Sequence, residues 1–276
     1  MTDQTEIEDE ISSQVPANVD AFEYLMQLPG ISYRELDGRR TALCQIGGRP
    51  YFLKTHVGVG WREILKNFIQ LRLPVISAKT EYVAIKLMPS LEIESMQCVA
   101  FAQRGVNPAT LRSFIITRAL ENTISLEDLM LRWQQEKPNA TSRRLKRLLI
   151  NRVADIARQL HQNGVNHRDL YLCHFRLPET DLVSGELTHL YLMDLHRAQI
   201  RKTTPARWQI KDLAGLHFSS MNAGLTRSDR YRFMCRYCQT DLSTTLSDSK
   251  LWHGVAQRAK KTYQKFHSNP ANAVDV

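Results

Sequence analysis

The sequence predicts an α+β protein of two lobes, in which a small strand-rich lobe precedes a mainly helical one. Between residues 19 and 120, short strand-like segments are separated by glycine-containing turns. After residue 121, apolar residues recur with helical spacing. The chain has 276 residues, of which 43% are apolar, and this length is sufficient for two lobes with buried cores. We therefore expect residues 19–120 to form the first lobe and residues 121–276 the second.

Charge is distributed unevenly along the chain. The first 30 residues hold seven acidic residues and no Lys or Arg, and the remainder holds 37 basic against 21 acidic residues, a charge of +16. Residues 1–18, which are polar and acidic, are expected to be a flexible tail. The basic remainder is suited to an anionic partner, whether nucleic acid, phosphorylated lipid or an acidic protein. No signal segment or bilayer-length apolar run is recognisable, so we expect a cytosolic protein.

The first lobe is expected to combine five strands with helices. Asp20 is a plausible N-cap for a short helix, and the stretch from Tyr33 to His56 indicates three strands with turns at residues 37–38 and 47–48. The later segments are two helices, "GWREILKNFIQLRL" and "AKTEYVAIKLM", and two strands, "ESMQCVAFAQRG" and "LRSFIITRAL".

Helices dominate the expected second lobe. Those before residue 164 are "ISLEDLMLRW" and "SRRLKRLLINRVADIARQLHQNG", and Gly164 ends the longer one. Two strand-like pieces follow, "HFRLPE" and "HLYLMDL", and helices return from about Gln209.

The stretch "GVNHRDLYLCHFRL" carries the clearest chemical signal. It follows a helix, so Asp169 is expected on a loop, where its carboxylate would accept a hydrogen bond from a hydroxyl and orient that hydroxyl for attack. Arg168 would steady this loop or an anionic group, and His167 is expected to be a packed, structural histidine. Asp194 follows 25 residues later at the end of the apolar strand "LYLM", a position suited to a magnesium ligand. This order of residues is typical of protein kinases, so we predict a protein-kinase-like fold and phosphoryl transfer.

Phosphoryl transfer also needs a cation on the nucleotide phosphates. Lys54, on the third expected strand, is the candidate, and Glu81 on the following helix is the carboxylate expected to fix its ammonium group, with Glu63 as a rival. A glycine-rich loop of the kinase type is absent. Gly38 and the backbone amides around it would cover the phosphates, or they form a simple turn. We therefore assign nucleotide binding to the first lobe, and the catalytic loop, metal site and acceptor binding to the second.

His174 stands where protein kinases carry a metal-binding asparagine. Imidazole nitrogen is a softer donor than an amide oxygen and suits magnesium less well. Three interpretations remain open: His174 binds magnesium or manganese weakly, it only donates or accepts a hydrogen bond, or the enzyme is inactive.

Several segments resemble one known family. "GVNHRDLYLCHF", "LYLMDLHRAQIR", "RWQIKDLAGLHFSSMNAGLTRSD" and "GGRPYFLKTHVGVGWREILKN" are similar to the lipopolysaccharide core heptose kinases of Gram-negative bacteria, over about residues 20–265. The resemblance implies ATP-dependent phosphorylation of the first inner-core heptose, for which we expect O4 as the acceptor. It implies Asp169 as the catalytic residue, Lys54 as the phosphate-binding lysine and Asp194 as a metal ligand, and it indicates that His174 belongs to the family's own pattern. Asp212 is similar to the aspartate that braces the catalytic loop in kinases.

The resemblance also implies cofactors, partners and a location. We expect ATP with Mg²⁺ or Mn²⁺, a nascent lipopolysaccharide core as the anionic acceptor, and a peripheral position at the cytoplasmic face of the inner membrane. Members of the family are associated with acyl carrier protein, a small acidic partner.

Three other functions compete with that of a heptose kinase. Another small-molecule or protein kinase is one, but a protein kinase would carry an Ala-Pro-Glu segment after Asp194, which is absent. A non-catalytic protein of kinase-like fold would bind nucleotide or lipid without needing Asp169. The third is nucleic-acid binding, and because the sequence contains no nucleic-acid-binding module, we expect no such partner.

Overall fold

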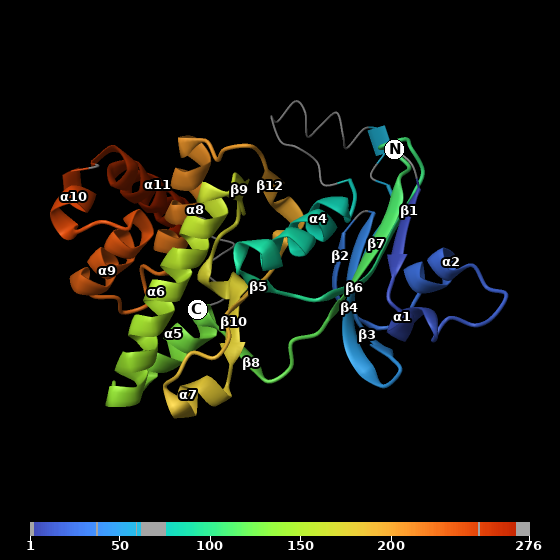
Figure 1. The fold of residues 1–276 in the computed structure, drawn as a ribbon, viewed down its shortest axis with the longest axis horizontal. Coiled ribbons are helices and arrows are strands. Elements are labelled where there is room, and N and C mark those ends of the chain that lie inside the picture. The colour runs from blue at the N-terminus through green and yellow to red at the C-terminus, as the bar shows by residue number, and fades with distance from the viewer. Residues whose placement is uncertain (1–2, 37, 59, 62–75, 248, 269–276) are drawn as a thin grey trace. The chain divides into compact units, whose positions relative to one another are not determined.

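The computed structural model describes residues 3–36, 38–58, 60–61, 76–247 and 249–268. The chain divides into two compact units. The first comprises Met1–Pro89, Ser95–Glu121 and Leu195–Arg197, and the second comprises Ser90–Glu94, Asn122–Asp194 and Ala198–Val276. Strands dominate the first unit and helices the second, so the predicted α+β class is confirmed (Figure 1).

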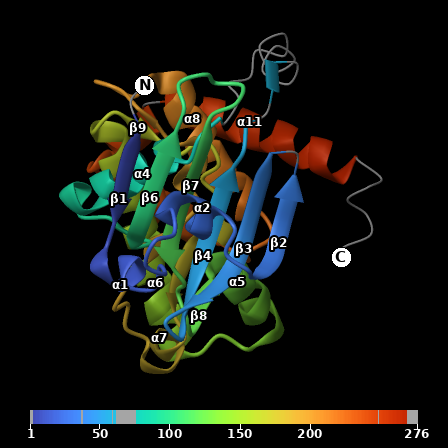
Figure 2. The same ribbon diagram turned by 90° about the vertical axis from the view of Figure 1, so that its right-hand side faces the viewer.

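The first unit is built on a six-stranded sheet in the order β1-β6-β7-β4-β3-β2, in which every neighbouring pair is antiparallel (Figure 2). The predicted turns at residues 37–38 and 47–48 lie between β2 and β3 and between β3 and β4. The strands are β1 (Gln4–Ile7), β2 (Ile31–Leu36), β3 (Arg39–Ile46), β4 (Arg49–His56), β6 (Cys98–Arg104) and β7 (Arg112–Arg118).

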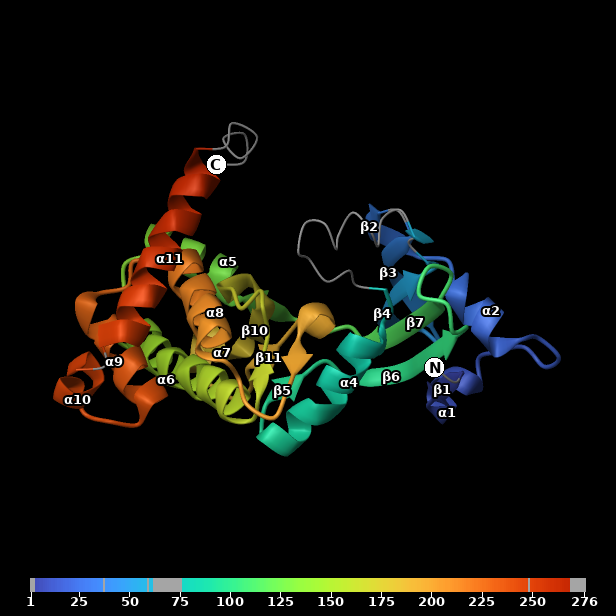
Figure 3. The same cartoon turned by 90° about the horizontal axis from the view of Figure 1, so that it is seen from above.

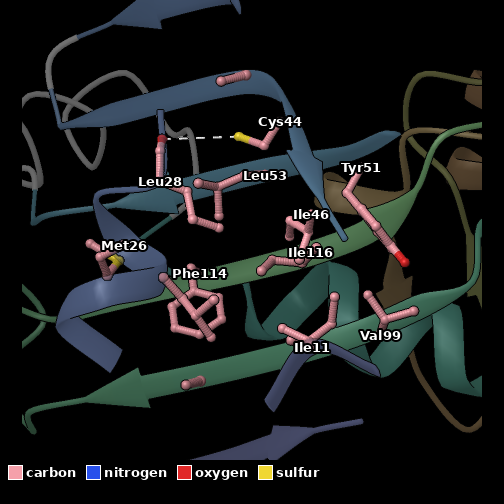
Figure 4. Close-up of a cluster of buried hydrophobic side chains, with 14 of the residues drawn as sticks. Ile11, Met26, Leu28, Cys44, Ile46, Tyr51, Leu53, Val99, Phe114 and Ile116 are labelled. Carbon is pink, nitrogen blue, oxygen red and sulfur yellow. Dashed lines mark hydrogen bonds between the residues drawn. The ribbon is translucent and has the colours of Figure 1, made fainter. Parts of the chain in front are cut away.

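Side chains alternate along each strand, so this sheet has one face of buried apolar side chains and an opposite face that carries Lys54. Tyr51 and Leu53 of β4 and Phe114 and Ile116 of β7 point into one hydrophobic core (Figure 4). The helices α1 (Asp9–Ser12) and α2 (Ala21–Met26) cover that face (Figure 2). Because successive side chains of a strand point to opposite faces, Lys54 lies on the other face. The helix α4 (Lys79–Leu87) packs there.

The segment expected to be a flexible tail instead forms part of the first unit. Its residues Gln4–Ile7 are β1, which pairs with β6, and Ile11 of α1 is fully buried in the core. Glu10 also forms a two-point ion pair with Arg118 at the end of β7. Composition alone missed this docking, because the acidic side chains find arginines on strands that are distant in sequence.

Acidic residues after position 18 also form ion pairs with arginines of the sheet. Asp20 accepts two hydrogen bonds from Arg104, and Glu23 accepts two from Arg112, at 2.6–2.8 Å. The bond from Arg104 lowers the pKa of the Asp20 carboxyl, and the bond from Arg112 lowers that of Glu23. The uneven charge seen in the sequence is therefore partly balanced within the first unit.

Of the two helices expected between residues 60 and 88, the second is α4. The first, "GWREILKNFIQLRL", falls mostly on residues 62–75, outside the described residues, and so does the rival carboxylate Glu63. Two short elements follow, the 3₁₀ turn η1 (Met88–Leu91) and β5 (Glu94–Ser95), where the chain passes between the two units.

In the second unit, a few short strands lie along one side of the long helices (Figure 3). In this unit α9 packs along α6, and α11 packs along α8. The helices are α5 (Leu126–Gln135), α6 (Ala140–Gln162), α7 (Thr180–Ser184), α8 (Ala206–Ser219), α9 (Arg227–Cys238), α10 (Leu242–Ser247) and α11 (Ser249–His267). The strands β8 (Thr123–Ser125), β10 (Phe175–Pro178) and β11 (Tyr191–Leu192) pair antiparallel, as do β9 (Val165–Asn166) and β12 (Gln199–Ile200).

Helix α8 begins at Ala206, three residues before the expected start. Pro205 precedes it as N-cap and sets a backbone angle that suits the entry to a helix. Asp212 therefore lies in the interior of α8. Among the described residues, no helix is long and apolar enough to cross a membrane.

The buried position of Ile11 generates the first prediction. Ile11→Ala should lower the free energy of unfolding by about 2–5 kcal/mol, because it leaves a cavity in the core. Denaturant unfolding would measure the loss, with Val106→Ala, whose side chain is 68% exposed, as the matched control. Equal stability of the two variants would mean that the N-terminal segment does not dock on the sheet.

Candidate active site

Lys54 and Glu81 form an ion pair in the first unit. Lys54 Nζ lies 2.6 Å from Glu81 Oε1, and the Glu81 side chain is only 1% exposed. β4 supplies the lysine and the first turn of α4 supplies the glutamate. The second carboxylate oxygen of Glu81 is buried and accepts no hydrogen bond from any described residue. A buried carboxylate is costly unless a cation accompanies it, so Glu81 depends on its contact with Lys54.

His56 lies two residues after Lys54 and points to the same face of β4. Burial, followed by the nearby charges of Arg39, Lys54 and His196, lowers the pKa of His56 to about 3. The ring is therefore neutral at physiological pH, and it adds no second cation beside Lys54.

Gly38 forms the turn between β2 and β3. Its φ of +75° lies in the left-handed region, which favours glycine, and its carbonyl accepts a hydrogen bond from the Val57 N–H. This geometry explains the residue type by the turn alone, and its relation to phosphates remains a prediction.

In the second unit, one carboxylate holds the loop that carries Asp169. Asp212 is fully buried in α8, and its two oxygens accept hydrogen bonds from the backbone N–H groups of His167 and Arg168, at 2.6 and 2.8 Å. Arg168 has a φ of +75°, which is strained for a residue with a long side chain. The two bonds to Asp212 supply the constraint that maintains this conformation.

Close backbone contacts fix both ends of the same loop. A side chain at Gly164 would place its Cβ 1.8 Å from the carbonyl oxygen of Arg201, and one at Gly215 would place it 2.7 Å from that of Leu170. Only glycine permits these approaches, so the loop lies directly against α8 and the segment after β12.

Two further residues, His161 and Tyr237, are linked to Asp212 through hydrogen bonds. Nε2 of the buried His161 lies 3.5 Å from an Asp212 oxygen, and its Nδ1 lies 2.8 Å from the hydroxyl of Tyr237. A carboxylate only accepts, so Nε2 carries a proton, and in the neutral ring Nδ1 accepts from Tyr237. Burial raises the pKa of Tyr237, which keeps its hydroxyl protonated as a donor.

The His167 side chain is also fully buried and packs within this loop. Its Nε2 donates to the carbonyl of Met193 at 2.9 Å, and its ring stacks on that of His174 with 5.6 Å between centroids. Burial lowers its pKa, so the ring stays neutral.

His174 connects Asp169 with Asp194. Its Nδ1 lies 2.7 Å from the backbone carbonyl of Asp169 and must carry a proton, because a carbonyl only accepts. The other ring nitrogen, Nε2, lies 3.6 Å from an Asp194 carboxylate oxygen. Asp194 has a φ of +60°, a conformation that aspartate tolerates better than most residues.

His174 and Asp194 offer one nitrogen and one oxygen donor, a set that suits a metal ion already bound to nucleotide phosphates and water. The described residues contain no cluster of three or more His, Cys, Asp or Glu side chains fit to hold a metal ion. Magnesium in nucleotide sites takes only one or two carboxylates from the protein and completes its shell with phosphate oxygens and water. Asp194 Oδ2 and His174 Nε2, 3.6 Å apart, are close enough to share one cation.

Lys211 joins this group, although no sequence pattern indicated a role for it. Its Nζ donates to the backbone carbonyl of Arg168 and lies 3.7 Å from Asp169 Oδ1. Lys211 precedes Asp212 in α8, so both act on one loop from adjacent positions. The sequence signal was only this adjacency, which does not show that the side chain points back to the loop.

The second unit also contains a partly open apolar cavity of about 310 Å³ between α5, α6, α8, α9 and α11. Its walls include Leu149, Val153, Leu216, Phe233 and Trp252. An ion pair between Lys146 of α6 and Asp229 of α9, 2.8 Å apart, lies among its polar lining residues.

Comparisons with known proteins agree on one family. A model of the lipopolysaccharide kinase (Kdo/WaaP) family matches residues 23–237. Two relatives are named lipopolysaccharide core heptose(I) kinase WaaP: one from Pseudomonas aeruginosa is 42% identical over 247 residues, and one from Escherichia coli is 45% identical over 231 residues. These matches cover 89% and 84% of this chain and 91% and 86% of the relatives. A solved structure described as WaaP in complex with acyl carrier protein superposes with a TM-score of 0.79 at 37% identity, covering 94% of this chain and 99% of that one.

The neutral state of His56 predicts a pH dependence of stability. Because its pKa is about 3 when folded and about 6.5 when unfolded, its contribution is present above pH 6.5 and is lost as pH falls from 6.5 toward 3. His56→Asn should reduce the slope of unfolding free energy in that window by up to about 1.4 kcal/mol per pH unit. Denaturant unfolding at pH 7, 6 and 5 measures the slope, with exposed His253→Asn as control. A slope in His56→Asn equal to that of the wild type would contradict a neutral, buried His56.

Proposed function

Because the chain belongs to the lipopolysaccharide kinase (Kdo/WaaP) family, we propose that it transfers the γ-phosphate of ATP to the first heptose of the lipopolysaccharide core. The relatives named heptose(I) kinase match this chain over most of both lengths. The observation that carries the proposal is the Asp169 loop, which is held at two backbone N–H groups by Asp212 and at the Asp169 carbonyl by His174. We place the new phosphate on O4 of the heptose.

In the proposed mechanism, each unit contributes part of the chemistry. Lys54, fixed by Glu81, holds oxygens of the nucleotide phosphates, and the turn at Gly38 covers them with backbone amides. Asp169 accepts a hydrogen bond from the heptose hydroxyl and directs its oxygen at the γ-phosphorus. As the new O–P bond forms, the bond from the γ-phosphorus to the β–γ bridging oxygen breaks, ADP leaves and the hydroxyl proton passes to Asp169. Asp194 and His174 would hold a nucleotide-bound Mg²⁺ or Mn²⁺, and the ion would supply positive charge to the phosphates. Arg168, His167 and Asp212 keep the loop in place.

The charge of the chain supports a membrane-bound, anionic acceptor. Residues after position 30 carry +16, and the nascent core is attached to a phosphorylated, acidic glycolipid. Basic residues near an anionic membrane surface each contribute about 1 kcal/mol of attraction. We therefore propose a peripheral position at the cytoplasmic face of the inner membrane.

We extend the partner of the solved relative, acyl carrier protein, to this chain. An acyl carrier protein presents an acyl chain, and the apolar cavity between α5, α6, α8, α9 and α11 offers a matching environment. Ala256→Phe, which fills part of this cavity, should weaken binding of the acylated form and leave the unacylated form unaffected. Calorimetric titration of both forms tests this, and equal binding of both by wild type would contradict it.

The catalytic assignment is tested by phosphate transfer. Purified protein with ATP and Mg²⁺ should phosphorylate core lipopolysaccharide that lacks the heptose phosphate, and Asp169→Asn should lower kcat by about 10²–10⁴-fold, since it removes the acceptor for the hydroxyl proton. Mass spectrometry and phosphorus NMR of the product locate the phosphate. Asp241→Asn, an exposed aspartate of the same unit, is the matched control.

Three results would contradict the assignment. Absence of transfer with both Mg²⁺ and Mn²⁺, by protein shown to be folded, would reject the heptose kinase. Full activity of Asp169→Asn would remove the catalytic role of that residue. Phosphate at another hydroxyl would overturn only the O4 position.

The position of His174 predicts how metal dependence responds to substitution. His174→Asn keeps both a donor for the Asp169 carbonyl and a metal-binding atom, so it should retain activity with Mg²⁺ within about tenfold. His174→Ala removes both and should raise the metal concentration for half-maximal rate by about 10–100-fold. Activity titrated with Mg²⁺ and with Mn²⁺ measures this, with His253→Ala as control. An unchanged metal titration in His174→Ala would show that His174 only supports the loop.

A further inference from the structure

Four basic side chains gather around the Trp208 ring in the second unit. The guanidinium carbons of Arg168, Arg201 and Arg207 lie 5.4, 5.7 and 5.5 Å from the ring centroid, and Lys211 Nζ lies 5.7 Å away. They come from the Asp169 loop, from the segment after β12 and from the first turns of α8. We call these five residues the Trp208 cluster.

The structure places a carboxylate and several neutral oxygens in contact with these cations. Asp169 lies 3.7 Å from Lys211, and Asp212 uses its oxygens for backbone N–H groups. Arg201 donates to the neutral side-chain oxygens of Asn166 and Gln199, at 2.5 Å each. Four cations within 5.7 Å of one ring centroid repel one another, and a bound anion would relieve this repulsion.

Arg207 has the most available side chain of the cluster. Arg207 is exposed, and the Trp208 ring is the one described group with which its side chain interacts. Cation–π contact orients a guanidinium without using its N–H donors. The N–H donors of Arg207 are therefore available to an external acceptor, and their planar arrangement matches a carboxylate or a phosphate.

The start of α8 adds to the positive potential. No side chain caps this 14-residue helix at Pro205, and Arg207 stands in its first turn. The first N–H groups of a helix lack intrahelical acceptors and carry partial positive charge. The cluster thus combines side-chain cations with the positive end of a helix.

We propose that the Trp208 cluster binds an anionic group of the acceptor glycolipid, a sugar carboxylate or a phosphate, beside the hydroxyl that Asp169 receives. The inference rests on the proposed function and adds to it the residues that grip the acceptor. Lys211 links the two roles, because the same side chain belongs to the cluster and contacts the Asp169 loop. This adjacency favours the acceptor over an acidic protein as the occupant.

Arg207→Gln tests the proposal with little risk to folding, since the side chain is exposed. The KM for core lipopolysaccharide should rise about tenfold, while kcat and the KM for ATP stay unchanged and the salt dependence of the acceptor KM weakens. Arg227→Gln is the matched control, because Arg227 is also an exposed arginine over an aromatic ring, at 5.1 Å from that of Tyr231. Equilibrium binding of the same acceptor without ATP gives a second readout that does not depend on catalysis.

Modified acceptors distinguish the two sources of negative charge. If a sugar carboxylate is bound, reduction of the carboxyl groups should abolish the difference between wild type and Arg207→Gln. If a phosphate is bound, enzymatic dephosphorylation of the lipid should abolish it instead. Either result supports an anion site and names its ligand.

The proposal is overturned if Arg207→Gln, and a double variant with Arg201→Gln, match Arg227→Gln in both acceptor KM and acceptor affinity. It is also overturned if these variants lose affinity for acyl carrier protein while acceptor binding is unchanged. Should the wild type bind the acceptor without phosphorylating it, the proposed function fails, and the binding comparison alone decides on the cluster.

Discussion

The buried carboxylate of Asp212 is the constraint on which the candidate active site depends. It accepts the backbone N–H groups of His167 and Arg168 and thereby maintains a loop in which Arg168 adopts a left-handed conformation. Asp169 follows directly, so its orientation depends on the same two bonds. A buried charge of this kind is costly unless its hydrogen bonds are complete, and here backbone donors provide them.

Other parts of the second unit are arranged around this carboxylate. His161 contacts Asp212 and is itself hydrogen-bonded to Tyr237. Gly215 allows the loop to lie against α8, the helix that carries Asp212. Lys211, the residue before it, reaches the loop from the same helix and also belongs to the Trp208 cluster. The candidate catalytic residue and the candidate acceptor-binding residues therefore share one supporting helix, α8.

Much of this arrangement could be predicted from local signals. Turn glycines located β2, β3 and β4, and apolar residues at helical spacing located α6, because each signal acts over a few residues. The order of Lys54, Glu81, Asp169 and Asp194 was readable because phosphoryl transfer needs these residue types in a recognisable sequence. The structure brings Lys54 and Glu81 into contact, and His174 within 3.6 Å of Asp194, while their roles in catalysis remain proposals.

What could not be predicted depends on partners distant in sequence. Composition suggested a mobile acidic tail, yet Glu10 pairs with an arginine 108 positions away. Charge counting likewise located no group of neighbouring basic side chains, although Arg168, Arg201 and Arg207 meet at one indole ring. Such encounters are set by tertiary packing, to which neither periodicity nor composition responds.

The most direct test of the role of Asp212 is hydrogen–deuterium exchange of residues 165–169 in wild type and in Asp212→Asn. The amide side chain is of equal size but accepts at only one atom, so one backbone N–H loses its acceptor. We predict that exchange in this segment accelerates about tenfold or more while α6 keeps its protection. Unchanged exchange of residues 165–169 would contradict the account, because it would show that burial alone, without this carboxylate, holds the loop.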